Sequence, residues 1–367
     1  MNAKAKAFLG CDVHQKNTWF SLAVVDPNGV PRRLDLGQVP TQHPALQAAL
    51  ENWQLKYSHL WPPVAVLETG DLSLLVHDVL LPFIDDVWVV DPFQVRQLRA
   101  RKTKTDREDA WALAEMAARG WLRPLFVPSP AQLGARALMR VRRSLIKTRT
   151  AEANRLRSLA NNARHPLPKA HVWTRANLAL LAATEWPNEP YRAAVEAAAR
   201  HVQFLTAELR TLYKHLRTLF DHDPHAQLLA TLPGCDRVLS LTLSTEIGDI
   251  SRFRSAAALR SFAALAPRGG ESAGRSTGLS TASHGNRYLR WAFGQIANDL
   301  GFLSSEDEPL ALLYRTWLRK LGRHPHKEMI AKAVVASELC DIVYAMLRHQ
   351  RPYEQRWPAG HLCPTAL

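Results

Sequence analysis

Four acidic side chains stand at positions suited to metal-dependent phosphoryl chemistry. Asp12 and Glu68 each end an apolar run that is predicted to be a β-strand, and Asp106 and Asp109 begin a predicted helix. Clustered carboxylates repel one another, so a fold that gathers them normally needs a cation between them. Mg²⁺, or Mn²⁺ in its place, is the expected ion, because a few carboxylates together with phosphate oxygens hold such a cation. The sequence therefore predicts that these four residues bind metal and act catalytically in nucleic-acid cleavage or strand transfer.

The helical pair also has a purely structural interpretation. Asp106 and Asp109 are three residues apart and share one face of the first turn. Thr105 can cap this helix while Glu108 reaches back to it, and acids are favoured at helix N-termini in any case. The pair alone leaves both interpretations open, whereas its combination with two acids at strand ends favours a metal site.

The predicted elements around these acids follow a recognisable order. Residues 7–25 are predicted to form a strand, a polar turn and a second strand, and the Asp-Pro-Asn-Gly sequence at 26–29 predicts a tight turn into a third strand. A helix at 44–57, the strand that ends at Glu68, a helix at 72–81 and a strand at 86–90 follow. Three meandering strands and then alternating helix and strand is the order of ribonuclease-H-like domains.

The positive charge of the chain is concentrated in one block. The net charge is +14, but residues 1–90 carry 6 Lys and Arg against 9 Asp and Glu, whereas residues 91–170 carry 18 against 6. A solvated helical surface is the alternative, yet an excess of one sign favours contact with a phosphate backbone. The residues predicted to bind nucleic acid are Arg101, Lys102, Lys104, Arg136, Arg140, Arg143, Lys147, Arg268, Arg275, Arg287 and Arg290.

Two long helical stretches, at 131–162 and 191–220, are joined by a Pro-containing segment. This arrangement predicts a helical hairpin or coiled-coil arm, which can mediate self-association or pack onto its own domain. The four cysteines are far apart and form no paired framework, so we expect a reduced compartment and read Cys11 as a core residue. No signal peptide and no apolar stretch of membrane-spanning length is expected, which favours a cytoplasmic or nucleoid-associated protein.

The C-terminal third contains a second possible reactive group. Leu232-Pro233-Gly234 before a helical run resembles a helix-hairpin-helix, although a negative Asp236 does not favour phosphate binding. A predicted loop at 266–278 is rich in small residues and places Ser272 among glycines and arginines. A serine there could attack a phosphodiester, or it could be an ordinary loop residue.

In this order the motifs resemble the DEDD-type insertion-sequence transposases related to the Piv site-specific DNA invertases. The resemblance extends over nearly the whole chain. It is carried by the Gly-Cys-Asp-Val-His segment around Asp12, the Leu-Glu-Thr-Gly segment around Glu68, and the segments at 104–110, 232–234, 252–255, 265–267, 271–274, 285–290, 326–347 and 352–353. Two positions depart from the family pattern: Ala273 stands where Gly is usual, and Ser283 stands where Lys is common.

The resemblance implies an α/β plus all-α protein. Its expected parts are a RuvC-like, ribonuclease-H-like DEDD nuclease domain at 1–125, a helical coiled-coil arm at 126–227, a helical transposase domain with a helix-hairpin-helix-like element at 228–352, and a tail at 353–367. It also implies a Mg²⁺-binding tetrad of Asp12, Glu68, Asp106 and Asp109, with Ser272 as the nucleophile that forms a phosphoserine link to DNA.

The partners that the resemblance implies are donor and target DNA, a structured bridge RNA as guide, and further copies of the chain in a dimer or tetramer. In such an oligomer the acids of one subunit meet the serine of another. Two other functions stay open at this point. One is a RuvC-like junction nuclease in which water attacks the DNA, and the other is an inactive nucleic-acid-binding remnant.

Overall fold

The computed structural model describes residues 7–98, 105–168, 171–272, 275–281, 285–302, 308–321 and 325–354. For 267–272, 275–281, 302 and 325–326 it describes the backbone only. The chain divides into two compact units, Met1–Val127 and Pro128–Leu367.

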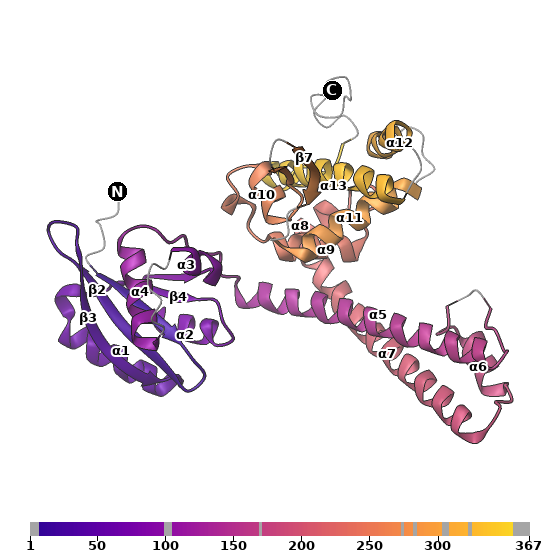
Figure 1. The fold of residues 1–367 in the computed structure, drawn as a ribbon, viewed down its shortest axis with the longest axis horizontal. Coiled ribbons are helices and arrows are strands. Elements are labelled where there is room, and N and C mark those ends of the chain that lie inside the picture. The colour runs from indigo at the N-terminus through magenta and orange to yellow at the C-terminus, as the bar shows by residue number, and fades with distance from the viewer. Residues whose placement is uncertain are drawn as a thin grey trace. The chain divides into compact units, whose positions relative to one another are not determined.

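The N-terminal unit is built on a five-stranded sheet of order β3-β2-β1-β4-β5 (Figure 1). Neighbouring strands among the first three are antiparallel, and the last two strands are added parallel to β1. The strands are β1 (Ala7–Val13), β2 (Asn17–Val25), β3 (Pro31–Pro40), β4 (Val64–Glu68) and β5 (Asp86–Val90). The predicted succession of strands and helices along the chain is confirmed, and this mixed α/β unit is consistent with the ribonuclease-H-like domain that the sequence predicted.

Alternation along β1 gives the sheet two different faces. Leu9 and Cys11 point to one side and join a core with α1 (His43–Lys56) and α2 (Ser73–Leu80). Residues 8 and 10 point to the other side, which is covered by α4 (Asp106–Ala118). Cys11 is fully buried, as expected of a core residue, and this burial raises the pKa of its thiol. The remaining helical elements of this unit are η1 (Ser58–Leu60) and α3 (Pro92–Leu98).

The C-terminal unit begins with the predicted helical hairpin. α5 (Pro130–Asn162) and α7 (Glu189–Asp221) pack side by side, and α6 (Arg175–Ala183) lies toward the end of the hairpin where the chain turns back (Figure 1). Leu156, Val195 and Val202 are buried together in an apolar cluster that includes residues of all three helices, so the arm has a core of its own. Phe204 on α7 is 59% exposed and does not belong to this core.

Beyond the arm, helices enclose a second large apolar core. Its centre contains fully buried side chains from two helices that are far apart in sequence, such as Phe293 and Val343. The elements are α8 (Pro224–Leu229), α9 (Arg237–Ile247), η2 (Ile250–Arg252), α10 (Ala256–Phe262), β6 (Pro267–Ser272), β7 (Arg275–Thr281), α11 (Arg287–Phe302), α12 (Pro309–Leu321) and α13 (Pro325–His349).

The prediction that residues 266–278 form a loop is wrong. Residues 267–272 (β6) and 275–281 (β7) pair in an antiparallel hairpin, in which Ser272 is the register partner of Arg275. Backbone hydrogen bonds stabilise such a ladder whatever the side chains are, so the run of Gly and Ser hid the alternation by which a strand is normally detected.

No helix in the described part of the chain is both long and apolar enough to cross a membrane.

Candidate active site

A very close backbone contact places α4 against β1. A Cβ added at Gly10 would stand 1.9 Å from the carbonyl oxygen of Ala110, a separation that no real side chain tolerates. Gly10 and Asp12 lie on the same face of β1 because side chains alternate along a strand. Asp106 lies one helical turn before Ala110 on α4, so the contact brings the start of this helix to the Asp12 end of the strand.

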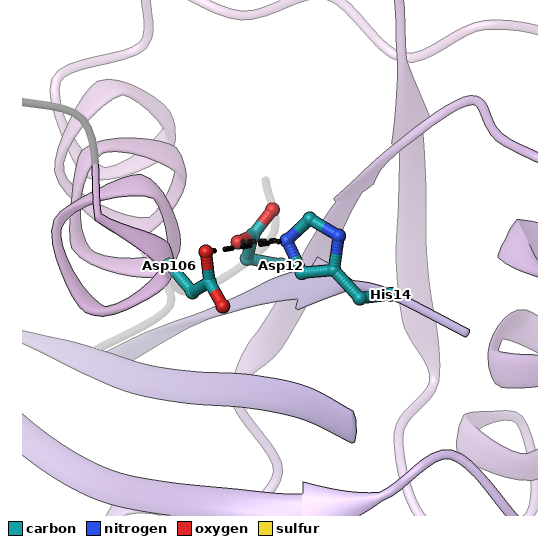
Figure 2. Close-up of side chains that lie close together, drawn as sticks. All are labelled: Asp12, His14 and Asp106. Carbon is teal, nitrogen blue, oxygen red and sulfur yellow. Dashed lines mark hydrogen bonds and ion pairs between the residues drawn. The ribbon is translucent and has the colours of Figure 1, made fainter. Parts of the chain in front are cut away.

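The contact unites two of the predicted metal ligands with a histidine. His14 Nε2 lies 3.0 Å from Asp12 Oδ2 and 3.5 Å from Asp106 Oδ1. Figure 2 shows the imidazole pointing between the two carboxylates, one of them carried by β1 and the other by α4. The Asp12 side chain is 16% exposed, whereas those of His14 and Asp106 are 53% exposed, so one side of the group is open to solvent.

The other two acids of the predicted tetrad lie next to this group. Cys11 is the register partner of Leu67 in the parallel pair of β1 with β4, so the following residues, Asp12 and Glu68, are neighbours on the face that α4 covers. Asp109 follows Asp106 by three residues, on the same side of the first helical turn, and is half-buried. The backbone therefore places Glu68 and Asp109 near the close group of Asp12, His14 and Asp106, but neither residue is a member of that group.

The donor set suits a divalent cation. One ligand atom each from Asp12, His14 and Asp106 lies within 4.8 Å of the others, and among the described residues only this group of three or more candidate ligands is that close. Carboxylate oxygens are ligands for Mg²⁺ and Mn²⁺, and imidazole adds a donor that transition ions accept more readily than Mg²⁺ does.

A network of charges fixes the start of α4 to β3. Arg33 donates to Asp35 Oδ1 at 2.8 Å and to Glu108 Oε1 at 2.6 Å, and Arg107 donates to Asp35 Oδ2 from two nitrogens, at 2.8 and 2.6 Å. Thr105 caps the helix by accepting from the backbone N–H of Glu108, as predicted. Burial alone would raise the pKa of Asp35, but hydrogen bonds from Arg33, Arg107 and Ser21 hold it below its usual range. The network positions the helix that carries Asp106.

Ser272, the predicted nucleophile, is the last residue of β6 in the C-terminal unit. Its backbone is described and its side chain is not, as for Arg268 and Arg275 in the same hairpin. Ala273 and Ser283 lie outside the described residues, as do the predicted phosphate contacts Arg101, Lys102 and Lys104. The assignment of these residues to the site stays a prediction.

Two of the arginines predicted to bind nucleic acid have a partner inside the chain. Arg140 donates from Nε and Nη2 to the two carboxylate oxygens of Glu246, each at 3.0 Å, and Arg136 donates to the backbone carbonyls of Thr245 and Glu246. The Glu246 side chain is only 1% exposed, and Asn286 Nδ2 also donates to it at 2.8 Å. These contacts join α5 to α9 and α11. The sequence predicted phosphate contacts for both arginines, and the structure gives them an additional, structural role.

Asp236 caps the helix that follows the turn at 232–234, which resembled a helix-hairpin-helix in the sequence. Its carboxylate accepts from the backbone N–H groups of Val238 and Leu239 at the start of α9. Gly234 has a φ of 75° in the turn between α8 and α9, a conformation that suits glycine. A carboxylate that already occupies these N–H groups takes the place that a phosphate would need there.

Three further residues predicted to bind nucleic acid line one groove of the C-terminal unit. Arg143 and Lys147 of α5 line a groove with Arg287 of α11, and Arg290 is half-buried on the same helix.

The sequence analysis did not assign a role to three of these residues. His14 is two positions from Asp12, a spacing that often places side chains on the same side of an extended chain. Glu246 is the only acid in the otherwise uncharged run at 238–247, and a buried acid needs a cationic or hydrogen-bonding partner. No local pattern signals Asp35, because its partners Arg33 and Arg107 meet it only through the fold.

Comparison with known proteins identifies the family. A family model described as Transposase matches residues 9–163, and the model of the Transposase IS116/IS110/IS902 family matches residues 226–305. The chain is 23% identical over 373 residues to a putative transposase, y4qE, of Sinorhizobium fredii, an alignment that covers 94% of this chain and 90% of the relative. It is 23% identical over 256 residues to the transposase for insertion sequence element IS1111A of Coxiella burnetii, with 69% of each chain covered.

A third relative is an inverting protein rather than a transposase by name. The pilin gene-inverting protein of Moraxella bovis is 28% identical over 144 residues, which are 36% of this chain and 39% of the relative. The two family models together span the acidic site, all of α5, and the segment from α8 to α11. The chain therefore belongs to the IS110-type transposases of the IS116/IS110/IS902 family, enzymes that act on DNA.

Proposed function

We propose that this transposase cleaves and rejoins DNA strands with two groups of its own residues. Asp12, Glu68, Asp106 and Asp109 hold a divalent metal ion, and Ser272 is the nucleophile. The observation that supports the proposal most directly is the placement of Asp12 and Asp106 around one imidazole nitrogen, with Glu68 and Asp109 adjacent on the backbone. Carboxylates this close together repel one another, and a bound cation relieves that repulsion.

The acidic residues would hold Mg²⁺ or Mn²⁺, which supplies positive charge at the scissile phosphate when bound. The chain's own contribution is orientation. Gly10 lets α4 approach β1, and Asp35 fixes the first turn of that helix through Arg33 and Arg107, so the carboxylates are in place before DNA binds.

Ser272 carries the covalent step. Its Oγ forms a bond to the phosphorus, the bond from phosphorus to the leaving sugar oxygen breaks, and the serine proton is transferred to that oxygen through a base or water. The hydroxyl of a second strand end then attacks the phosphoserine, which restores the serine and joins the strands. One phosphodiester is exchanged for another, so no ATP is needed. A serine hydroxyl is a weak nucleophile without a base or metal nearby.

Two copies of the chain share the proposed site. Asp12 belongs to the N-terminal compact unit and Ser272 to the C-terminal one, so the acids of one subunit can act with the serine of another in a dimer or tetramer. Besides donor and target DNA, we propose a structured guide RNA as partner. The block of 18 Lys and Arg against 6 acids at 91–170 supports a large phosphate-binding surface.

The deciding experiment compares nucleophile and metal-site variants on labelled DNA. We expect Asp12→Asn and Asp106→Asn to abolish metal-dependent cleavage and Ser272→Ala to abolish both cleavage and the covalent protein–DNA adduct seen on a denaturing gel. Ser276→Ala in the facing strand is the matched control. Cleavage by Ser272→Ala without an adduct would indicate attack by water, as in a junction nuclease, and an adduct on that variant would place the nucleophile elsewhere. Wild-type protein that never cuts would indicate an inactive remnant.

A further inference from the structure

A groove of about 510 Å³ lies in the C-terminal unit between α5 and α11. Nine described residues line it and none of them is acidic, whereas five carry a full positive charge: Arg140, Arg142, Arg143, Lys147 and Arg287. The volume is that of a small-molecule site, and the charge is that of a site for several phosphates. Residues more than 130 positions apart in sequence form it, so the fold and not a local charge run creates the groove.

Aromatic rings hold the cations of the groove in place. The Arg143 guanidinium carbon lies 5.4 Å from the ring centroid of Tyr288 and 4.8 Å from that of Trp291. Arg140 and Arg287 also lie over the Tyr288 ring, at 4.6 and 5.0 Å. A ring attracts a guanidinium without neutralising it, so these contacts fix the positions of the arginines and leave their charge available to an anion.

Two further observations concern the charge of the groove: among the described residues, no carboxylate lines it. Burial lowers the pKa of Arg143, Tyr288 opposes this shift, and the positive charge of the neighbouring Arg287 adds to it. Arg142 donates from Nη2 to the Tyr213 hydroxyl at 2.7 Å, but its buried Nε has no acceptor among the described residues. Of the five cations, Arg140 has an ion pair, and its carboxylate partner, Glu246, is not part of the groove lining.

We propose that this groove binds an unpaired nucleic-acid strand, with its phosphates on the arginines and Lys147 and a base stacked on Tyr288 or Trp291. Both rings are half-buried, so each has some exposed surface. Aromatic faces and guanidinium planes stack on bases that are not already stacked in a helix. A duplex would offer only its backbone to the same residues. The inference rests on the proposed function in one respect, that the enzyme handles nucleic acid, and concerns strand capture rather than the chemical step.

The test measures binding of the full-length protein to fluorescein-labelled 12-mers by anisotropy, without divalent metal so that no cleavage occurs. The probes are single-stranded DNA, single-stranded RNA, a duplex of the same sequence, and a single strand with several abasic positions. Tyr288→Leu removes a stacking surface, Tyr288→Phe keeps the ring, and Arg143→Gln removes one charge. Arg210→Gln, an exposed arginine of α7 that does not line the groove, controls for the loss of net charge.

We expect Tyr288→Leu to weaken binding of the single strand by roughly five- to a hundredfold, as loss of one stacked base does, and to change duplex binding and abasic-strand binding much less. Tyr288→Phe should bind like wild type. Arg143→Gln should weaken all probes and reduce the salt dependence, whereas Arg210→Gln should have little effect. The comparison of DNA with RNA single strands identifies which strand the groove prefers.

If Tyr288→Leu weakened binding of the duplex, the single strand and the abasic strand equally, the inference would be overturned, and the groove would contact only the nucleic-acid backbone. Unchanged binding of every probe by both Tyr288→Leu and Arg143→Gln would exclude the groove altogether. Neither result bears on cleavage by the acidic site, and inactive metal-site variants can still bind single strands, so the two proposals fail separately.

Discussion

Gly10 and Ala110 are in such close contact that the strand and the helix share no room for a single carbon between them: a Cβ at position 10 would lie 1.9 Å from the Ala110 carbonyl oxygen. The next residue on that face of β1 is Asp12, and the previous helical turn carries Asp106. The close contact between Gly10 and Ala110 therefore sets the distance between Asp12 and Asp106, the two proposed metal ligands. It lies one helical turn from Asp106.

Gly10→Ala should consequently damage both stability and the site. The added methyl must push α4 away from the sheet, which we expect to cost at least about 1–3 kcal/mol of unfolding free energy, the usual range for overpacking a core. Thermal unfolding and titration with Mn²⁺ would measure the two effects. Gly70→Ala is the control, since a Cβ there meets nothing within 4 Å. A Gly10→Ala protein that melts and binds metal like wild type would contradict the close contact.

Asp35→Asn should make stability less sensitive to acid. The pKa of Asp35 is lower in the folded chain than its ordinary value of 3.8, so its charged form stabilises the fold. That contribution is fully present above about pH 4 to 5 and is lost as the pH falls through 3.8 toward the lower folded-state value. The melting temperatures of wild type and Asp35→Asn should therefore differ most near neutral pH and converge below pH 3.8.

Asp71→Asn removes the same charge from an exposed position of the same unit and serves as control. A constant difference between wild type and Asp35→Asn from pH 7 to pH 2 would show that the Arg33–Asp35–Arg107 network does not stabilise the fold through its charge.

Local patterns were sufficient to predict most of the elements that carry the acidic site. Apolar runs ended at Asp12 and Glu68, and Thr105 signalled the start of α4, so the strands and helix were found where the structure has them. What the sequence did not show was distance. His14 joins the site only because Gly10 lets the helix approach, and a packing contact of this kind leaves no periodic signal.

The charged residues show more clearly that the sequence predicts elements but not the contacts between them. The sequence correctly placed Arg136, Arg140 and Arg143 in one long helix, but charge alone does not tell whether the partner is a phosphate or a buried carboxylate. Arg140 turned out to face Glu246 across more than a hundred residues of sequence. The β6–β7 hairpin was missed for a related reason. Backbone pairing stabilises it, and its small side chains give no alternating pattern that would reveal strands.

Glu246→Gln should loosen the junction between the arm and the C-terminal helices. Breaking a buried, hydrogen-bonded ion pair by removing one charge typically costs about 3–5 kcal/mol, because the other partner is left buried and uncompensated. Arg136 would be that partner, since its side chain is only 13% exposed. Denaturant unfolding would measure the loss, and hydrogen exchange should show faster exchange in α9 and the first turns of α5.

The exposed pair of Glu196 and Arg200 on α7 supplies the matched control. Glu196→Gln should change the unfolding free energy by no more than about 0.5 kcal/mol, as expected of a surface position. If Glu246→Gln is equally mild, the pair does not hold the junction together.

His14→Gln should change which metal ion the acidic site prefers. The imidazole nitrogen lies within 3.5 Å of both carboxylates, close enough for all three to contact one ion. Imidazole is a better ligand for Mn²⁺ than for Mg²⁺, so its loss should weaken Mn²⁺ binding by roughly tenfold or more and Mg²⁺ binding much less. Calorimetric titration with each ion, and the electron paramagnetic resonance signal of bound Mn²⁺, measure these affinities without any cleavage assay.

His59→Gln, which changes an exposed histidine of the same unit, is the control, and Asp12→Asn should lose both ions. Equal weakening of Mn²⁺ and Mg²⁺ by His14→Gln would mean that His14 orients the carboxylates instead of contacting the metal.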